Sequence, residues 1–302
     1  MDILSDVICA LRTGRPGGAR VDWYAPWARR FPDQPGTAGI LVVLQGSSWL
    51  IDESAEPVQL GPGDILFSPH GSGYAMADDP ATPLAACREA TTEEADSQPT
   101  ATNPATVTLC GGYELDPSWT HPLLRELPDV IHVPARRGRH PELRAAVDIL
   151  GAEMESPHLG ADALIPIVLD MLLLYILRSW FEEHPRRATT TGWAAALADD
   201  AVSTALNAIH NEPARPWTVQ ELADEARLSR AAFFRRFGAL TGQPPLAYLT
   251  WWRMTIAAGM LRDSASSIDT VASRVGYTSE SAFANAFKRH FGIAPGKFRR
   301  QP

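Results

Sequence analysis

The chain has 302 residues, 45% of them hydrophobic, and a formal net charge of −8. This length is sufficient for two domains with separate cores, and the acidic balance excludes a protein that is basic throughout. The three cysteines, Cys9, Cys87 and Cys110, form no Cys-x-x-Cys pair and have no zinc-site spacing. Their pattern fits a reducing compartment better than a disulfide framework.

No membrane or secretory segment is expected. The longest apolar run, residues 163–177, contains Pro166 and Asp170 and is too short to span a bilayer. Residues 1–10 contain Asp2 and Asp6 but lack the basic segment of a secretory signal. We therefore expect a cytoplasmic protein that has no membrane partner.

Residues 1–135 have the pattern of a β-rich domain. The segments expected to form strands are 39–46, 48–52, 57–60, 65–69 and 106–113. Gly61-Pro62-Gly63-Asp64 is a strong turn signal between two of these strands. The polar segment 91–105 has no apolar periodicity, so we expect a loop there. Short strands separated by Gly/Pro turns predict a barrel or a sandwich.

Two helices are expected within residues 136–183. In residues 141–154 the apolar side chains Leu143, Val147 and Leu150 recur at helical spacing and form one stripe. Residues 162–181 are apolar nearly all round, with Val168, Leu172 and Tyr175 among many others, so this helix must be buried on several sides. The polar residues 184–194 are expected to form a linker between domains.

The last hundred residues carry one pattern twice. Leu222 and Val271 are 49 residues apart, whereas Phe237 and Phe287 are 50 apart. The second copy has therefore gained one residue in its turn. Chance does not readily produce a repeat of this length that stays in register at apolar, small and turn positions. Each copy predicts a short helix, a tight turn and a longer helix, which is a helix-turn-helix.

Each longer helix is expected to have a buried face and an exposed face. Ser229 and Ser279 are placed to cap the longer helices. Phe233 and Phe237 should be buried in the first copy, and Phe283 and Phe287 in the second. The opposite faces are polar in both copies and suit contact with DNA, although a solvated face of a helical bundle would have a similar pattern.

The segment from about 195 to 300 resembles the DNA-binding domain of the AraC/XylS family of bacterial transcription regulators. Motifs that carry the resemblance are the two repeats, Gly242-Gln243-Pro244-Pro245, the Gly276-Tyr277 turn and Phe291-Gly292-Ile293-Ala294-Pro295. The resemblance implies two helix-turn-helix units joined by a long helix over 245–263. It also implies that the longer helices enter major-groove segments roughly 34 Å apart along the duplex.

The resemblance assigns roles to individual residues of the two longer helices. Base-reading positions are Arg230, Ala231, Phe234, Arg235, Glu280, Ser281, Ala284 and Asn285, and phosphate contacts are Arg236 and Lys288. Arginine suits the guanine O6 and N7 atoms, asparagine suits the adenine N6 and N7 atoms, and glutamate can accept from cytosine N4. The two alanines offer only apolar contact.

The distribution of charge supports this division. From Ala195 onward there are 13 Lys and Arg against 9 Asp and Glu, a net of +4, whereas the first 194 residues have a net of −12. Cations are needed where phosphates are bound, because neutralising phosphates releases counterions. The acidic N-terminal part should repel DNA and is expected to have another role.

Residues 1–135 resemble the cupin-type sensor domain that is joined to AraC-type DNA-binding domains. The matching segments are residues 60–65, 69–71, 110–113, 122–124 and 127–128. The chain departs from metal-binding cupins because it lacks the His-x-His pair and the downstream glutamate, so no metal and no cofactor are expected. His70 alone lies where a ligand would be, and a single histidine is more often a hydrogen-bonded residue of the core or rim.

A signal could reach this domain in two ways. The candidates for a ligand pocket are Trp49, Phe67, His70 and Tyr74, although the same aromatic residues could simply fill the barrel. Some members of the resembling family respond to oxidants through a cysteine, and Cys110 falls at the Cys-Gly position of this subgroup. Such a response requires a lowered pKa and access, and no Lys or His adjoins Cys110 in sequence.

The resemblance also implies that the helix pair forms a homodimer interface. Its expected members are Leu143, Val147, Leu150, Val168, Leu172 and Tyr175. The expected fold is α+β, with a cupin-like β-barrel (1–135), a helical dimerisation segment (136–183), a linker (184–194) and an all-α domain with two helix-turn-helix motifs (195–302).

The expected function is sequence-specific regulation of transcription, and activation and repression of the target genes both stay open. Its expected partners are double-stranded DNA, RNA polymerase, a second copy of the chain and a small-molecule effector or an oxidant. The sequence contains no Gly-x-Ser-x-Gly elbow, P-loop, dinucleotide fingerprint or His-Glu-x-x-His motif, so no enzyme is expected. Two alternatives stay open: a cupin-fold enzyme fused to a DNA-binding domain, and an architectural DNA binder without a ligand.

Overall fold

The fold is that of a computed structural model, which describes residues 3, 6, 12–51, 56–84, 88–89, 103–115, 122–135, 140–183, 192–263 and 266–300. The chain divides into two compact units. The strand-rich unit comprises Arg12–Thr120 and Leu127–Glu183, and the helical unit comprises Met1–Leu11, His121–Glu126 and His184–Pro302. Most of the expected linker, and much of the loop expected at 91–105, lie outside the described residues.

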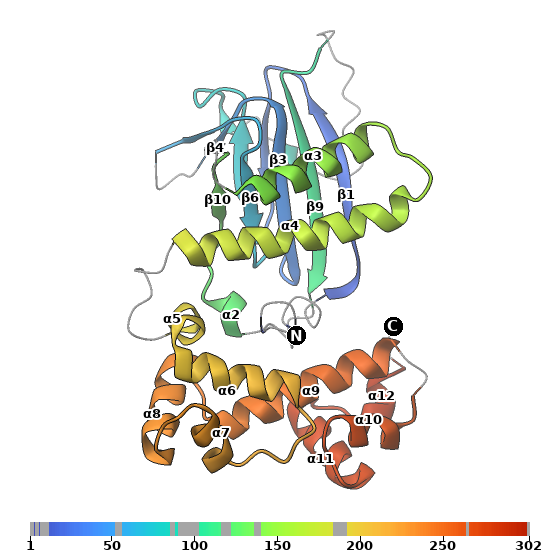
Figure 1. The fold of residues 1–302 in the computed structure, drawn as a ribbon. Coiled ribbons are helices and arrows are strands. Elements are labelled where there is room, and N and C mark those ends of the chain that lie inside the picture. Colours follow the sequence, from blue (N-terminus) through green and yellow to red (C-terminus); the bar gives the residue numbers. More distant parts are fainter. Residues whose placement is uncertain are drawn as a thin grey trace. The chain divides into compact units, whose positions relative to one another are not determined.

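The described part of the strand-rich unit contains two five-stranded sheets (Figure 1). The first has the order β1 (Arg12–Trp23), β9 (Thr106–Leu115), β3 (Thr37–Gly46), β6 (Ile65–Ser68) and β10 (Ile131–Val133). The second has the order β5 (Val58–Leu60), β4 (Ser48–Ile51), β7 (Tyr74–Ala77), β2 (Ala28–Phe31) and β8 (Arg88–Glu89). Pairing is antiparallel except between β2 and β8. The expected α+β class is confirmed.

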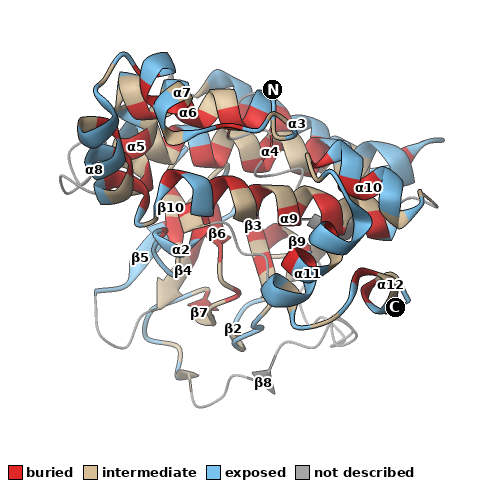
Figure 2. Cartoon of the chain, turned by 90° about the horizontal axis from the view of Figure 1, so that it is seen from below, coloured by how far each residue is buried: buried red, intermediate tan, exposed pale blue. Residues whose placement is uncertain are grey.

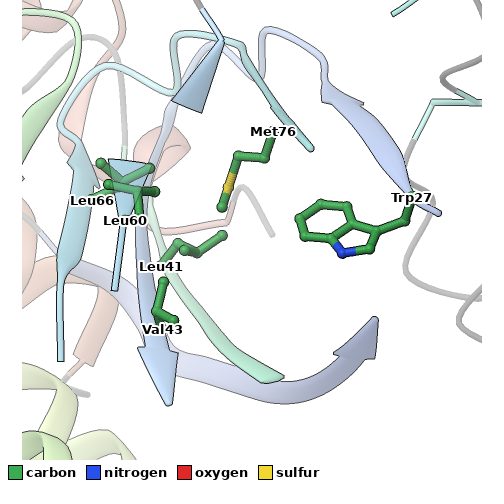
Figure 3. Packing of buried hydrophobic residues seen from close by; sticks show 6 residues of the cluster. All are labelled: Trp27, Leu41, Val43, Leu60, Leu66 and Met76. Carbon is green, nitrogen blue, oxygen red and sulfur yellow. The ribbon is translucent and has the colours of Figure 1, made fainter. Parts of the chain in front are cut away.

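The first sheet has two buried faces. Leu41, Val43 and Leu66 point into an interior shared with Leu60 and Met76 of the second sheet (Figure 3). Because side chains alternate along a strand, their neighbours, such as Phe67, face the other way. A sheet covered on both sides needs continuous apolar strands, which explains the unbroken Ile-Leu-Val-Val-Leu run of β3.

Helices α3 (Pro141–Glu155) and α4 (Ala161–Glu183) cover the outer face of the first sheet (Figure 1). A Cβ atom placed on Gly111 of β9 would lie 2.8 Å from the Leu169 Cδ2 atom of α4, so the glycine permits this close approach. The expected interface residues Leu143, Val147, Leu150, Val168 and Leu172 are buried within the unit, and Tyr175 is half-buried. Their apolar pattern therefore reflects packing on the sheet.

Helix α4 is longer than the apolar run from which it was predicted. It has 23 residues and contains an 18-residue stretch with a mean hydropathy of 1.8, so by length and composition alone it could cross a membrane. The argument that the segment is too short was therefore wrong. Its buried residues, including Leu172 and Ile176, pack against α3 and the sheet, as expected for a core helix of a folded domain.

The Gly61-Pro62-Gly63-Asp64 turn is held by its aspartate. The Asp64 carboxylate accepts hydrogen bonds from the backbone N–H of Gly61 at 3.0 Å and of Ala135 at 2.6 Å. His132 Nε2 lies 3.3 Å from the same carboxylate. Burial alone would raise the pKa of Asp64, but these hydrogen bonds lower it below its ordinary value. The turn predicted from sequence is thus also a link to the end of β10.

The helical unit is built around one long helix, α9 (Pro245–Asp263). The helices that accompany it are α2 (Pro122–Arg125), α5 (Trp193–Ala198), α6 (Asp200–Asn211), α7 (Val219–Glu225), α8 (Arg230–Thr241), α10 (Ile268–Arg274), α11 (Glu280–Phe291) and α12 (Pro295–Phe298). Buried positions recur along most of α9 (Figure 2). Because its apolar residues do not keep to one face, α9 can contact helices on several sides.

A segment that precedes α3 in sequence belongs to the helical unit. Leu123 and Leu124 of α2 are buried, and the next residue but one, Glu126, accepts a hydrogen bond of 2.5 Å from the backbone N–H of Trp193. Burial raises the pKa of Glu126, and this hydrogen bond opposes the rise. The free N–H groups at the start of α5 thereby gain an acceptor that lies 67 residues away.

We predict that Leu172→Ala destabilises the strand-rich unit by about 2–5 kcal/mol, because the Leu172 side chain is fully buried and its loss leaves a cavity. The matched control is Ile167→Ala on the same helix, where 63% of the residue is exposed. Thermal unfolding followed by circular dichroism compares the two variants. Equal effects would contradict the packing of α4 described above.

Candidate nucleic-acid interface

The two helix-turn-helix motifs, α7–α8 and α10–α11, begin their second helices in the same way. Ser229 Oγ accepts a hydrogen bond of 3.3 Å from the Ala232 N–H, and Ser279 Oγ accepts one of 3.2 Å from the Ala282 N–H. Both serines therefore act as the N-caps predicted from sequence. In each motif the cap side chain bonds to the N–H of the third residue of the second helix, and this fixes where the helix begins.

The first helices are also capped. Thr218 and Glu221 form a capping box at the start of α7, with hydrogen bonds in both directions between backbone and side chain. Hydrogen bonds from Thr218 lower the pKa of Glu221 below its ordinary value. Ser267 caps α10 through a 3.1 Å hydrogen bond from the Thr270 N–H. These short helices, of seven residues each, gain stability from their caps.

A pair of phenylalanines orients each second helix. Phe233 and Phe237 are fully buried, and their ring centroids are 5.5 Å apart. Phe283 and Phe287 are also fully buried, with the same separation. Residues four apart lie on one face of a helix, so burial of each pair turns the opposite face of α8 or α11 toward solvent.

The predicted base-reading residues lie on these outward faces. Arg230, Ala231 and Arg235 of α8 are exposed, as is Phe234, at 47%. In α11, Glu280, Ser281 and Asn285 are exposed, and Ala284 is half-buried. The two faces differ in charge. Helix α8 presents arginines, whereas α11 begins with Glu280 and has the amide side chain of Asn285 near its middle.

The two predicted phosphate contacts differ in their surroundings. Arg236 forms an ion pair with Asp199, and its Nε–H donates a 2.7 Å hydrogen bond to the Asp199 carboxylate. Asp199 is also the N-cap of α6, so Arg236 fastens α8 to the start of α6. Lys288 is exposed and has no such partner within the described residues. A phosphate contact by either residue stays a prediction.

Arg253 of α9 holds the loop that connects α6 to α7. Its guanidinium donates hydrogen bonds to the carbonyl oxygens of Pro213 at 2.7 Å and of Arg215 at 2.8 Å. The Arg215 guanidinium in turn lies over the Trp217 ring at 3.8 Å. These arginines contribute to the net positive charge of the helical unit, but their contacts position the segment that leads into α7.

A buried polar cluster lies beside α9 and was not foreseen from sequence. His210 of α6 is buried, with Nδ1 2.9 Å from Asp6 Oδ2 and Nε2 2.6 Å from the Tyr248 hydroxyl oxygen. Its ring stacks on Trp252 at 4.2 Å. Burial raises the pKa of Tyr248 well above its ordinary value, and the Asp6 carboxylate adds to the rise. Because a carboxylate can only accept, Nδ1–H is the donor to Asp6, and in a neutral imidazole Nε2 then accepts from the Tyr248 O–H.

The structure disperses the four predicted pocket residues of the strand-rich unit. Tyr74 lies in the shared interior, stacked on Phe31 at 4.8 Å. Phe67 faces the helices, as the alternation along β6 requires, and Trp49 is half-buried in the second sheet. His70 lies outside this cluster, where its Nε2 is 3.0 Å from the Leu127 carbonyl oxygen. The described residues contain no group of three potential metal ligands.

Other aromatic residues line the shared interior. Trp23 stacks on Trp27 at 4.8 Å and makes an edge contact with Phe31 at 6.3 Å. The Trp23 indole N–H donates a 2.7 Å hydrogen bond to Thr108, whereas the buried Trp27 indole N–H has no acceptor among the described residues. Figure 3 shows the Trp27 ring directed toward Met76 and Leu41. Sequence reasoning missed these tryptophans because they precede the strands that it recognised.

Cys110 adjoins the same interior. Burial raises its pKa to about 11, and the hydrogen-bonding contact with Thr108 opposes the rise only in part. A thiol with this pKa is protonated at neutral pH, and the thiolate is the form that reacts with oxidants. Cys9 and Cys87 lie outside the described residues.

Comparison with known proteins found relatives that span both units. The family model described as "Cupin" matches residues 2–182, and the one described as "Helix-turn-helix domain" matches residues 222–301. A Streptomyces lividans protein named as an AraC-like transcription regulator is 34% identical over 304 residues, covering 100% of this chain and 99% of its own length. The transcriptional regulator AlkR of Acinetobacter baylyi is 27% identical and covers 100% of both chains.

The solved structures similar to the helical unit include a complex with DNA. It is the DNA-binding domain of AdpA in complex with a target DNA, which is 35% identical and covers 33% of this chain and 90% of its own, with a TM-score of 0.32.

We predict that Asp6→Ala destabilises the helical unit by about 1–3 kcal/mol, because the buried His210 Nδ1–H loses its acceptor. Asp6→Asn, which keeps a carbonyl oxygen, should lose less. Asp148→Ala, at an exposed aspartate of α3, is the control. Far-ultraviolet circular dichroism during thermal unfolding measures the differences. An Asp6→Ala protein as stable as the control would show that the buried hydrogen bond contributes nothing.

Proposed function

The chain belongs to the AraC-like transcription regulators, and from this premise we propose that α8 and α11 read the base sequence of two neighbouring major-groove segments. The protein is a DNA-binding transcription regulator with a cupin-type N-terminal domain. The observation that carries the proposal is the repeated construction of its two helix-turn-helix motifs. In each, a serine cap and a buried phenylalanine pair leave one face of the second helix exposed.

The chemistry of the two faces favours different bases. Arg230 and Arg235 of α8 offer the forked donor pattern that matches guanine O6 and N7. Asn285 of α11 matches adenine, and Glu280 can accept from cytosine N4. Phe234 and Ala231 offer apolar surface for a thymine methyl group. We propose that the first motif prefers G-containing sequences and that the second contributes discrimination with less electrostatic attraction.

We predict that Arg235→Ala costs about 1–3 kcal/mol in binding to the preferred site and relaxes preference at one base position. Lys288→Ala, which removes a phosphate contact, should weaken preferred and random duplexes alike. The preferred site is obtained by selection from a pool of random duplexes with the unaltered protein, and affinities are measured at a fixed salt concentration. Equal weakening of both duplexes by Arg235→Ala would contradict base reading by this residue.

We propose that the strand-rich unit senses a small molecule. Its shared interior is lined by Trp23, Trp27, Phe31 and Tyr74, and aromatic walls suit an apolar molecule that contains a ring. The Trp27 indole N–H is a donor without an acceptor, so a ligand with one hydrogen-bond acceptor would fit best. The raised pKa of Cys110 argues against the oxidant as the signal. Ligand control requires tighter binding to one DNA-binding state than to the other.

We further propose a homodimer, formed by side chains other than those expected from the sequence. Leu143, Val147, Leu150, Val168 and Leu172 are buried in the unit's own core, so they are unsuited to contact a second copy. Exposed apolar residues of the same helices are Ile149 at 45%, Leu164 at 38% and Ile167 at 63%. Exposed apolar surface on a helix pair is typical of an isologous contact between two copies.

We predict that Ile167→Glu yields monomers that remain folded, because Ile167 is exposed and a charge there opposes burial in an interface. Leu159→Glu, at an exposed residue between α3 and α4, is the matched control and should leave the dimer intact. Light scattering at micromolar concentration measures the mass of each protein. If the unaltered protein had the mass of a monomer, the proposed homodimer would be wrong.

The remaining partners are proposed by analogy with the relatives. Relatives that match most of the chain are named as transcription regulators rather than as enzymes. We propose that this chain likewise performs no catalysis, contacts RNA polymerase at its promoters in the manner of an activator, and acts in the cytoplasm, where its DNA lies. Two alternatives are less well supported. A cupin-fold enzyme would need metal ligands in the cupin-type domain. An architectural DNA binder without a ligand would need no aromatic lining in that interior.

A further inference from the structure

Two residues other than glycine have a positive φ angle in the described chain, His140 at 52° and Arg227 at 53°. The left-handed conformation is unfavourable for a residue that has a Cβ atom. His140 has contacts that hold it: its Nε2 lies 3.1 Å from Ser179 Oγ and 3.3 Å from a Glu183 carboxylate oxygen. Arg227 has no such contact, so its conformation calls for another reason.

Arg227 lies in the turn between α7 and α8, and the internal repeat supplies its counterpart. Gly276 is 49 residues later, at the same position in the second motif, with φ 83°. The backbone around both residues makes the same hydrogen bonds. Arg227 N donates to Asp224 O at 3.0 Å and Gly276 N donates to Ser273 O at 3.1 Å, and the next residue in each motif bonds at 2.9 Å to the first helix. The turn therefore needs a left-handed residue, and glycine is the unstrained choice.

Different surroundings explain why only the first motif tolerates a side chain there. A Cβ atom on Gly276 would lie 2.4 Å from the Ala214 carbonyl oxygen, so no other residue fits. Arg227 is exposed, so a side chain there has room. Room permits an arginine but does not favour it over glycine, because the left-handed φ still carries its conformational cost.

The Arg227 guanidinium is available for an external partner. Within the described residues it forms no ion pair or side-chain hydrogen bond, although Asp224 and Glu225 are close in sequence. One Asp224 carboxylate oxygen instead accepts a 2.8 Å hydrogen bond from the Gln220 amide. A free cation on a strained residue is an arrangement that does not stabilise the fold and is typical of a functional position.

We propose that Arg227 binds a DNA phosphate at the edge of the major groove that α8 enters. In a helix-turn-helix the first helix crosses the sugar–phosphate backbone and the second lies in the groove, so the turn between them is close to the phosphates. Contacts from such positions fix the register of the protein on the duplex without reading sequence. In the first motif Arg236 already bonds to Asp199, so Arg227 supplies the phosphate contact that positions the motif on the duplex. The inference rests on DNA binding by the helical unit.

Two substitutions separate the contribution of the charge from that of the backbone. Arg227→Gln removes the charge and keeps a residue with a Cβ atom in the left-handed conformation. Arg227→Gly removes the charge and the strain together, as in the second motif. Arg144→Gln, at an exposed arginine of α3 without a partner in the described chain, controls for the loss of one positive charge. All are made in the full chain.

The measurement is the affinity for a random-sequence duplex as a function of salt, together with the melting temperature without DNA. Both Arg227 variants should bind about fivefold more weakly at about 0.15 M salt, and the slope of log affinity against log salt should fall by about 0.9. Arg227→Gly should melt at a higher temperature than Arg227→Gln. The control should match the unaltered protein in affinity and slope.

Each other outcome has a definite meaning. An unchanged salt slope in both Arg227 variants, with the unaltered protein binding DNA, would overturn the phosphate contact alone. A slope change as large in Arg144→Gln would also overturn it, because the effect would then belong to net charge. If the unaltered protein failed to bind any duplex, DNA binding by the helical unit would itself be wrong, and Arg227 with it.

Discussion

The position of each DNA-facing surface depends on two phenylalanines buried four residues apart. Phe233 with Phe237, and Phe283 with Phe287, meet at the same 5.5 Å centroid separation. Fully burying an aromatic ring is worth a few kcal/mol, so this contact decides the rotation of α8 and α11 about their axes. Because that rotation is fixed, candidate base-reading residues such as Arg235 of α8 and Asn285 of α11 are exposed on the opposite faces. Function here follows from which side of the helix is buried.

The helix-turn-helix motifs could be predicted in detail from sequence because their determinants are local. The serine caps, the glycines with positive φ at 242 and 292, and the paired phenylalanines all lie within a few residues of the elements that they define. The buried Asp6–His210 hydrogen bond could not be predicted, because its partners are 204 residues apart. Neither residue lies in a motif, and a histidine between Ile209 and Asn211 looks like any helix residue.

Sequence periodicity identified apolar faces correctly but not what covers them. The stripe of Leu143, Val147 and Leu150 was assigned to a second copy of the chain, and the structure buries it within one unit. Phe67 was assigned to a pocket, and the alternation along β6 turns it toward the helices instead. In both cases the pattern fixes which side of an element is apolar, whereas the partner depends on the packing of the whole sheet, which the pattern does not contain.

Net charge is a similarly incomplete guide to the DNA-binding surface. Beyond Ala195 the chain carries 13 Lys and Arg, but the structure uses several of them internally: Arg236 holds Asp199, and Arg253 holds the loop before α7. The exposed guanidiniums of Arg227, Arg230 and Arg235 are left in the first motif without partners in the described chain. In the first motif, electrostatic attraction to DNA should therefore come from α8 and its preceding turn. In the second motif Glu280 lies at the start of α11, and the exposed cations Lys288 and Arg289 lie in its last turn, so attraction to phosphates should come from that end of the helix.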